Sequence, residues 1–133
     1  MSPPMPAPVA AAFAAFPPET RARLSEVREV IFALAEETGT GPLTETLKWG
    51  QPAYLTQATK AGGTIRLGVE GGAPAVLFHC QTTLVESFRA DLPRAFAYSG
   101  NRAVLLAPDS DPDALALCLT RALTYHRSRK SRA

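Results

Sequence analysis

A short segment, residues 47–54, concentrates the side chains that are best suited to bind a ligand. It contains Lys48, Trp49, Gln51 and Tyr54 around a glycine and a proline. Trp and Tyr each join an apolar ring to a polar group, while the lysine and the amide add charge and hydrogen bonding, a composition typical of a pocket wall. The alternative is that Trp49 and Tyr54 fill the core where the chain turns from a helix into a strand. The sequence leaves both interpretations open.

Two residues in the expected strands extend this candidate site. Arg66 lies in an alternating segment, residues 64–70, and His79 lies in the next one, where alternation places it on the face of Leu77 and away from Phe78. The predicted ligand-binding residues are therefore Lys48, Trp49, Gln51, Tyr54, Arg66 and His79.

Catalytic chemistry finds little support in the sequence. His79 precedes Cys80, but neighbouring strand residues point to opposite faces, so a Cys-His pair is geometrically poor. The chain has no glycine-rich phosphate loop and no HExxH motif, and Cys80 and Cys118 lack a metal-binding spacing. We assign no catalytic residue and no cofactor. The favoured function is non-enzymatic binding of a small molecule or a protein partner, with enzymatic activity left open.

Four glutamates on the expected long helix suggest an alternative function as iron ligands. They are Glu26, Glu29, Glu36 and Glu37. Carboxylates suit a metal ion, but Arg21, Arg23 and Arg28 alternate with them, so ion pairs along the helix are the better explanation.

The net charge of +2 is unevenly distributed. Residues 121–133 carry five basic residues and no acid, whereas residues 1–120 carry a charge of −3. A basic tail, residues 128–133, suggests a third alternative, a weak contact with nucleic acid. No aromatic residue lies among the bases after Tyr125, so nucleic acid is not the expected partner.

Length and hydropathy favour one domain, residues 1–133, with a loose proline-rich arm at residues 1–8. No apolar run approaches the roughly 20 residues of a membrane span. Residues 7–16 are apolar, but the first basic residue of the chain is Arg21. A signal peptide requires a basic residue before its apolar segment. We therefore expect a cytoplasmic location and no membrane association, and the sequence does not indicate an oligomeric state.

Hydrophobic periodicity predicts an α+β fold in which an antiparallel sheet of about five strands packs against N-terminal and C-terminal helices in two layers. The expected helices are residues 9–15, 19–38, 83–88 and 111–127, with one or two helical turns at 43–49. The expected strands are residues 53–57, 64–70, 73–80, 95–98 and 102–107.

At residues 47–54 the chain resembles the YdhG-like family, small bacterial domains of unknown function. Weaker similarity lies in residues 16–31, 76–79 and 84–88, and the resemblance covers about residues 9–127. It implies an antiparallel sheet backed by helices. Some members are linked to iron delivery in the manner of frataxin, which implies the iron-binding alternative described above.

Overall fold

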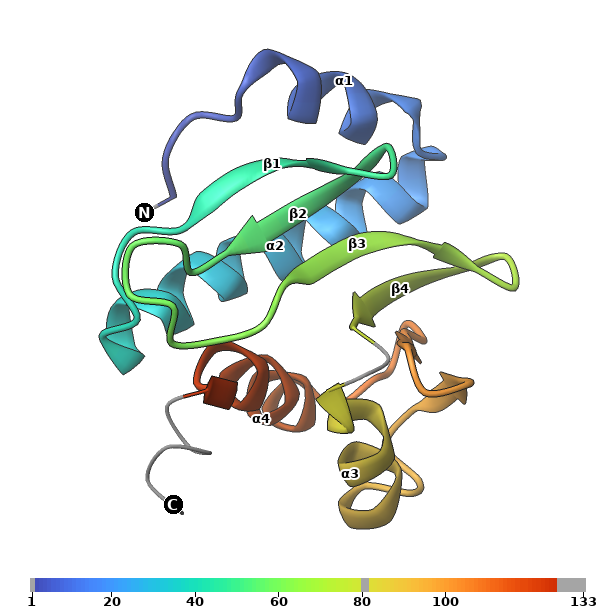
Figure 1. Cartoon of the computed structure of the whole chain (residues 1–133). Helices are drawn as coiled ribbons and strands as arrows, with labels where there is room; N and C mark the ends of the chain where they lie inside the picture. Colours follow the sequence, from blue (N-terminus) through green and yellow to red (C-terminus); the bar gives the residue numbers. More distant parts are fainter. Residues whose placement is uncertain (1, 80–81, 127–133) are drawn as a thin grey trace.

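The computed structural model describes residues 2–79 and 82–126, and within them the chain forms four helices and six strands (Figure 1). The helices are α1 (Ala7–Ala15), α2 (Pro18–Thr38), α3 (Leu84–Asp91) and α4 (Pro112–Leu123). The strands are β1 (Thr44–Lys48), β2 (Gln51–Leu55), β3 (Ile65–Glu70), β4 (Ala73–Phe78), β5 (Ala97–Ser99) and β6 (Ala103–Leu105). None of the helices among these residues has the length and hydrophobicity needed to cross a bilayer.

All six strands join one antiparallel sheet in the order β1-β2-β3-β4-β6-β5. The predicted fold class is confirmed, with one strand more than expected. The additional strand is β1, and the prediction of helical turns at residues 43–49 is wrong. Thr44 and Thr46 are β-branched, and a two-residue turn joins this segment to β2, so residues 44–48 pair as a strand.

The helices pack against one face of this sheet. Strand alternation and register direct one set of side chains, including Tyr54, Ile65 and Phe78, into a single buried cluster that also contains Phe13 of α1 and Ile31 of α2. The opposite set, the open face, contains Thr46, Lys48, Gln51, Ala53, Arg66, Gly68, Ala75, Leu77, Ala103 and Leu105. Figure 1 shows α2 passing behind strands β1 to β3, on the far side of the sheet from the viewer.

Two helix ends are capped in the way that their residue types favour, and a third is not. Gly39 ends α2 with a left-handed φ of 66°, and the Asp111 carboxylate caps α4 by accepting the Asp113 N–H at 2.9 Å, as these residue types favour. Thr83 and Glu86 have the spacing of a capping box at the start of α3, but no such box forms. Thr83 has a φ of 60°, and its hydroxyl donates to the Thr82 carbonyl, so it does not cap α3.

A charged network lies buried between α2 and β1. The Glu45 carboxylate accepts hydrogen bonds from Arg28 Nε at 2.6 Å, from Arg28 Nη2 at 2.8 Å and from the Tyr54 hydroxyl at 2.8 Å. Only 4% of the Arg28 side chain and 5% of the Glu45 side chain are exposed. The hydrogen bond to Glu45 raises the pKa of Arg28, and burial raises the pKa of Tyr54 well above its usual range, so the guanidinium is charged and the phenol is protonated.

The same arginine holds the start of the chain. Arg28 Nη2 donates to the Pro3 carbonyl at 2.7 Å and Nη1 donates to the Ser2 hydroxyl at 3.0 Å, while that hydroxyl donates to Glu29 at 2.7 Å. Residues 2–3, expected to belong to a loose arm, are therefore tied to α2. Arg28 turns inward because Glu45 lies on β1, a segment for which the sequence predicts helical turns.

Cys118 illustrates how closed the core is. Its thiol is fully buried on α4, and burial raises its pKa to about 12. The thiol is therefore protonated and unreactive at neutral pH. In a Cys80→Ser variant we expect no reaction of the native protein with a thiol reagent at pH 8, and one equivalent to react after unfolding. Rapid labelling of the native variant would contradict this packing.

Candidate ligand-binding face of the sheet

The β1–β2 hairpin places a tryptophan in an unusual backbone conformation. Lys48 and Gln51 form the last pair of the hairpin, and the two residues between them, Trp49 and Gly50, both have positive φ, at 51° and 74°. This is the pattern of a type I′ turn, in which asparagine and glycine are the usual occupants. A bulky residue in that region is strained by about 1–2 kcal/mol. Yet 81% of Trp49 is exposed.

Arg66 and Gln51 hold the indole from the sheet side. The Arg66 guanidinium lies over the Trp49 ring, 4.9 Å from its centroid, and Arg66 Nη1 donates to Gln51 Oε1 at 2.7 Å. Gly68 leaves room for this amide, because a Cβ atom at that position would lie 2.5 Å from Gln51 Nε2. Pro52 has no N–H to donate, and pairing between β2 and β3 begins at Ala53. Side-chain contacts with Arg66 on β3, and not backbone pairing, therefore hold the tip of the β1–β2 hairpin against the sheet.

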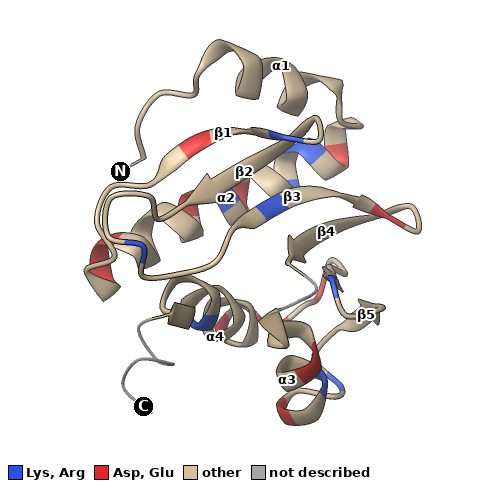
Figure 2. Cartoon of the chain, viewed as in Figure 1, with Lys and Arg blue, Asp and Glu red and all other residues tan. Residues whose placement is uncertain are grey.

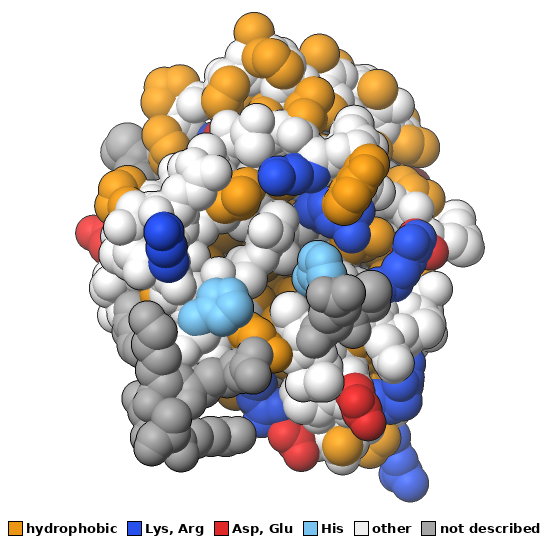
Figure 3. Space-filling view, in the orientation of Figure 1, with side chains coloured by type: hydrophobic (Ala, Val, Ile, Leu, Met, Phe, Trp, Pro, Cys, Tyr) orange, Lys and Arg blue, Asp and Glu red, His pale blue; other side chains and the backbone are white. Residues whose placement is uncertain are grey.

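Two of the three charged side chains on the open-face side of β1 to β3 are basic, and the face also carries a small buried apolar cluster of Ala75, Leu77 and Ala103. Figure 2 marks basic positions in the β1–β2 hairpin and in β3, which are Lys48 and Arg66. Glu70 is the acid on the open-face side of β3, and it is paired with Arg102 and accepts from Ser99. In the space-filling view, blue and pale blue side chains gather around a hollow in the middle of this face (Figure 3). The face is suited to a negatively charged ligand.

The structure separates the six predicted ligand-binding residues into three groups. Lys48, Trp49, Gln51 and Arg66 come together on the open face. Tyr54 points the other way, is fully buried and packs edge-to-face against Phe32. Between the two interpretations left open, Trp49 is therefore a surface residue and Tyr54 a core residue.

His79 lies just beyond β4 and lines the hollow that Figure 3 shows between the two histidines. Together with Gly63, Thr64, Tyr125 and His126 it lines a cavity of about 340 Å³, which we call the histidine recess. Its position relative to Leu77 and Phe78 agrees with the predicted alternation. The spacing of residues in the sequence does not indicate that the loop before β3 meets the end of α4, so it does not predict that His126 joins His79.

The four glutamates of the iron-binding alternative do not share a site. Glu26 contacts Arg23 at 3.4 Å and Glu29 accepts from Ser2, whereas Glu36 and Glu37 lie at least seven residues further along α2, about 10 Å along the axis. In the part of the chain that the structure describes, no three His, Cys, Asp or Glu residues lie close enough to hold one ion. The basic tail, residues 128–133, lies outside the described residues.

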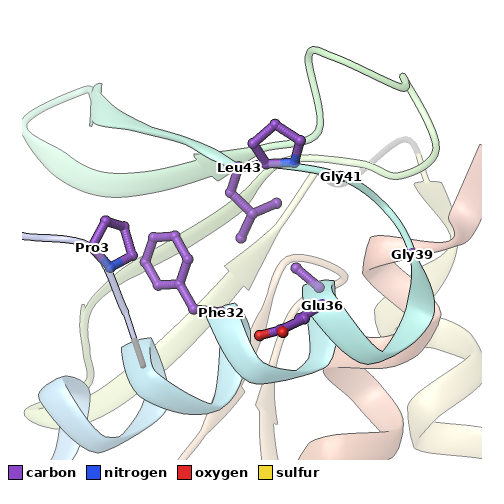
Figure 4. Close-up of a pocket in the computed structure, with 8 residues that line it drawn as sticks. Pro3, Phe32, Glu36, Gly39, Gly41 and Leu43 are labelled. Carbon is purple, nitrogen blue, oxygen red and sulfur yellow. The ribbon is translucent and has the colours of Figure 1, made fainter.

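A second hollow has an apolar character. Pro3, Phe32 and Leu43 line a groove of about 470 Å³ between α2 and the segment that leads into β1, with Glu36 at its edge (Figure 4). The Pro3 and Phe32 rings lie side by side in Figure 4, so the chain start held by Arg28 forms one end of this groove. It contains none of the predicted ligand-binding residues.

The element order and the packing of the helices on one side of a six-stranded antiparallel sheet define an α+β domain with the YdhG-like fold. The chain is similar to the crystal structure of a DUF1801 family protein, YdhG from Bacillus subtilis. The match has a TM-score of 0.58 and 17% sequence identity, and it covers 92% of this chain and 90% of that chain. It confirms the fold implied by residues 47–54. No family model and no curated protein match the sequence.

Proposed function

We propose that this protein is a non-enzymatic binding protein whose open sheet face holds an anionic ligand with a planar group, in contact with Trp49 and Arg66. The observation that carries this proposal is the tryptophan itself. A large apolar ring sits at a turn position that favours Asn or Gly, and most of its surface is in water. Neither the turn nor the core requires an indole there.

The arrangement of the ring indicates the shape of the ligand. Arg66 occupies one side of the indole, and the exposed surface of Trp49 offers a flat apolar platform for a second planar group. Stacked rings prefer an offset geometry and gain about 0.5–1.5 kcal/mol beyond the area they bury. Gln51 fixes Arg66 through its hydrogen bond, so the stack exists before the ligand arrives and little ordering is needed on binding.

Charge indicates the sign of the ligand. Lys48 adjoins Trp49 in the chain and Arg66 lies against its ring, while the nearby acid Glu70 is paired with Arg102. A carboxylate or phosphate next to the ring would gain charge-assisted hydrogen bonds, each of about 1.5–3 kcal/mol. A neutral planar molecule would gain the stacking alone.

Fluorescence of Trp49, the only tryptophan, tests the proposal directly. A panel of aromatic carboxylates and nucleoside monophosphates, each paired with an uncharged analogue, is expected to include anions that quench the indole saturably. Arg66→Met should weaken these anions at least tenfold, equivalent to about 1.4 kcal/mol, and should leave any weak neutral binding unchanged. Absence of saturable quenching, or equal affinity for the uncharged analogues, would contradict the proposal.

Trp49→Asn separates the ligand role from a structural one. Asparagine tolerates the left-handed backbone and relieves about 1–2 kcal/mol of strain, while the lost contact with Arg66 costs about 0.5–1 kcal/mol. We therefore expect a melting temperature that is unchanged or up to about 4 °C higher, together with at least a tenfold loss of anion affinity by calorimetry. Leu117→Asn, a change at another exposed apolar residue, is the control and should leave affinity unchanged. A marked loss of stability in Trp49→Asn would indicate a structural role.

A further inference from the structure

We infer that the histidine recess is a separate binding site for a small oxyanion, a phosphate or carboxylate group carried by a free ion or a small molecule. The inference does not depend on the ligand proposed for Trp49. It rests on the lining of the recess, on the rigid frame around it and on the distribution of charge. Figure 3 shows the two histidines on the same face, bordering the central hollow.

The frame is built where the loop before β3 meets the end of α4. The Gly63 N–H donates to the Ala122 carbonyl at 2.9 Å, and the His126 N–H donates to the Ala61 carbonyl at 2.8 Å. Gly62 lies so close to α4 that a Cβ atom would be 2.3 Å from the Leu123 carbonyl oxygen. These contacts hold the loop against the end of α4, so backbone atoms of the loop and the helix fix the shape of the recess.

The lining supplies donors and lacks carboxylates. The residues with side-chain donors that line this volume of about 340 Å³ are His79, His126, Tyr125, Thr64 and Thr82, and no Asp or Glu of the described residues lines it. An imidazole donates one N–H when neutral and two when protonated. The ring of Tyr125 meets that of His126 edge-on at 5.2 Å and restricts its orientation. The volume exceeds that of one phosphate ion and accommodates a small group attached to it.

The surrounding charge favours an anion. Arg66 pairs with Leu77 on β4, so His79, two residues further along the same face, is its diagonal neighbour. The carbonyl end of α4 would oppose an anion, but two of its carbonyls already accept hydrogen bonds. The Ala122 oxygen is bonded to Gly63, and the Thr120 oxygen is bonded to the N–H and hydroxyl of Thr124.

The chain has only two histidines, so two imidazole signals in a proton NMR spectrum report on the recess. Titration with inorganic phosphate, at constant pH and ionic strength, should shift both signals saturably with one common dissociation constant of about 1 mM or tighter. Chloride should shift neither. His79→Gln and His126→Gln should each weaken phosphate at least tenfold, reported by the remaining histidine, with unchanged melting temperatures. Arg94→Gln removes a cation outside the recess and is the control, with affinity unchanged.

The inference is overturned if phosphate shifts neither histidine or only one, if chloride acts equally, or if Arg94→Gln weakens phosphate as much as the histidine variants. Trp49→Asn distinguishes this site from the proposed function, because it should abolish stacking of planar anions and leave the phosphate titration unchanged. Phosphate binding at the histidines without quenching of Trp49 by any anion would contradict only the proposed function. Quenching of Trp49 without phosphate binding would contradict only the inference that the histidine recess binds an oxyanion.

Discussion

Replacing Glu45 with alanine is expected to lower the free energy of unfolding by about 3–5 kcal/mol, the range for breaking a buried ion pair by removing one partner. The change leaves the Arg28 guanidinium charged and buried, with two donors deprived of their acceptor. It also removes the acceptor of the Tyr54 hydroxyl, whose side chain is fully buried. Chemical denaturation of the purified variant measures the loss.

Two further variants define the origin of this effect. Glu26 forms an exposed pair with Arg23, with 70% of the glutamate side chain accessible, so Glu26→Ala should cost less than about 1 kcal/mol. The double variant Arg28→Met/Glu45→Leu should recover much of the loss, because no unpaired charge remains buried. A cost below about 1 kcal/mol for Glu45→Ala would show that Arg28 finds water or another acceptor.

Replacing Gly62 with alanine is expected to destabilise the protein by about 3 kcal/mol or more, the upper part of the range for overpacking. The added methyl group would lie 2.3 Å from the Leu123 carbonyl oxygen and 2.4 Å from that of Ala122. Both obstacles are backbone, so they cannot move aside as a flexible side chain does. The loop would have to leave α4, and the phosphate-induced shifts of His79 and His126 should be lost as well.

The neighbouring glycine provides a matched control. A Cβ atom at Gly63 would meet only the Thr82 methyl group, at 3.9 Å, an ordinary contact. Gly63→Ala should therefore change stability by less than about 1 kcal/mol and preserve phosphate binding. Equal effects of the two substitutions in denaturation and NMR would mean that the loop is not held against the helix end as described.

The sequence predicts most of the elements and the fold class, and the exceptions have physical causes. Two strands that meet at the Gly71-Gly72 hairpin are recognisable because Ile65, Leu67 and Val69 alternate with polar or small residues. β1 is missed because its apolar content is low and its turn carries Trp49, where Asn is the usual signal for a hairpin. Alternation along the same strand could have placed Glu45 and Leu47 on the core face.

The candidate site was predictable in composition but not in geometry. Residues 47–54 contain the side chains that the structure gathers at the hairpin, yet strand register decides that Tyr54 faces the helices while Gln51 faces solvent. The partnership of His79 with His126 depends on contacts between a loop and a helix 60 residues apart in the chain. Local patterns carry no information about such contacts, so the recess could not be found from the sequence.

The position of β1 at the margin of the sheet has a consequence for association between molecules. An outer strand offers unpaired backbone groups to which another chain can add. Here α1 runs beside β1 (Figure 1), and the link from Arg28 to Ser2 and Pro3 fixes the chain just before that helix. The opposite margin, β5, has only three residues. Loss of the Arg28–Glu45 pair would therefore also uncover an edge through which molecules could aggregate.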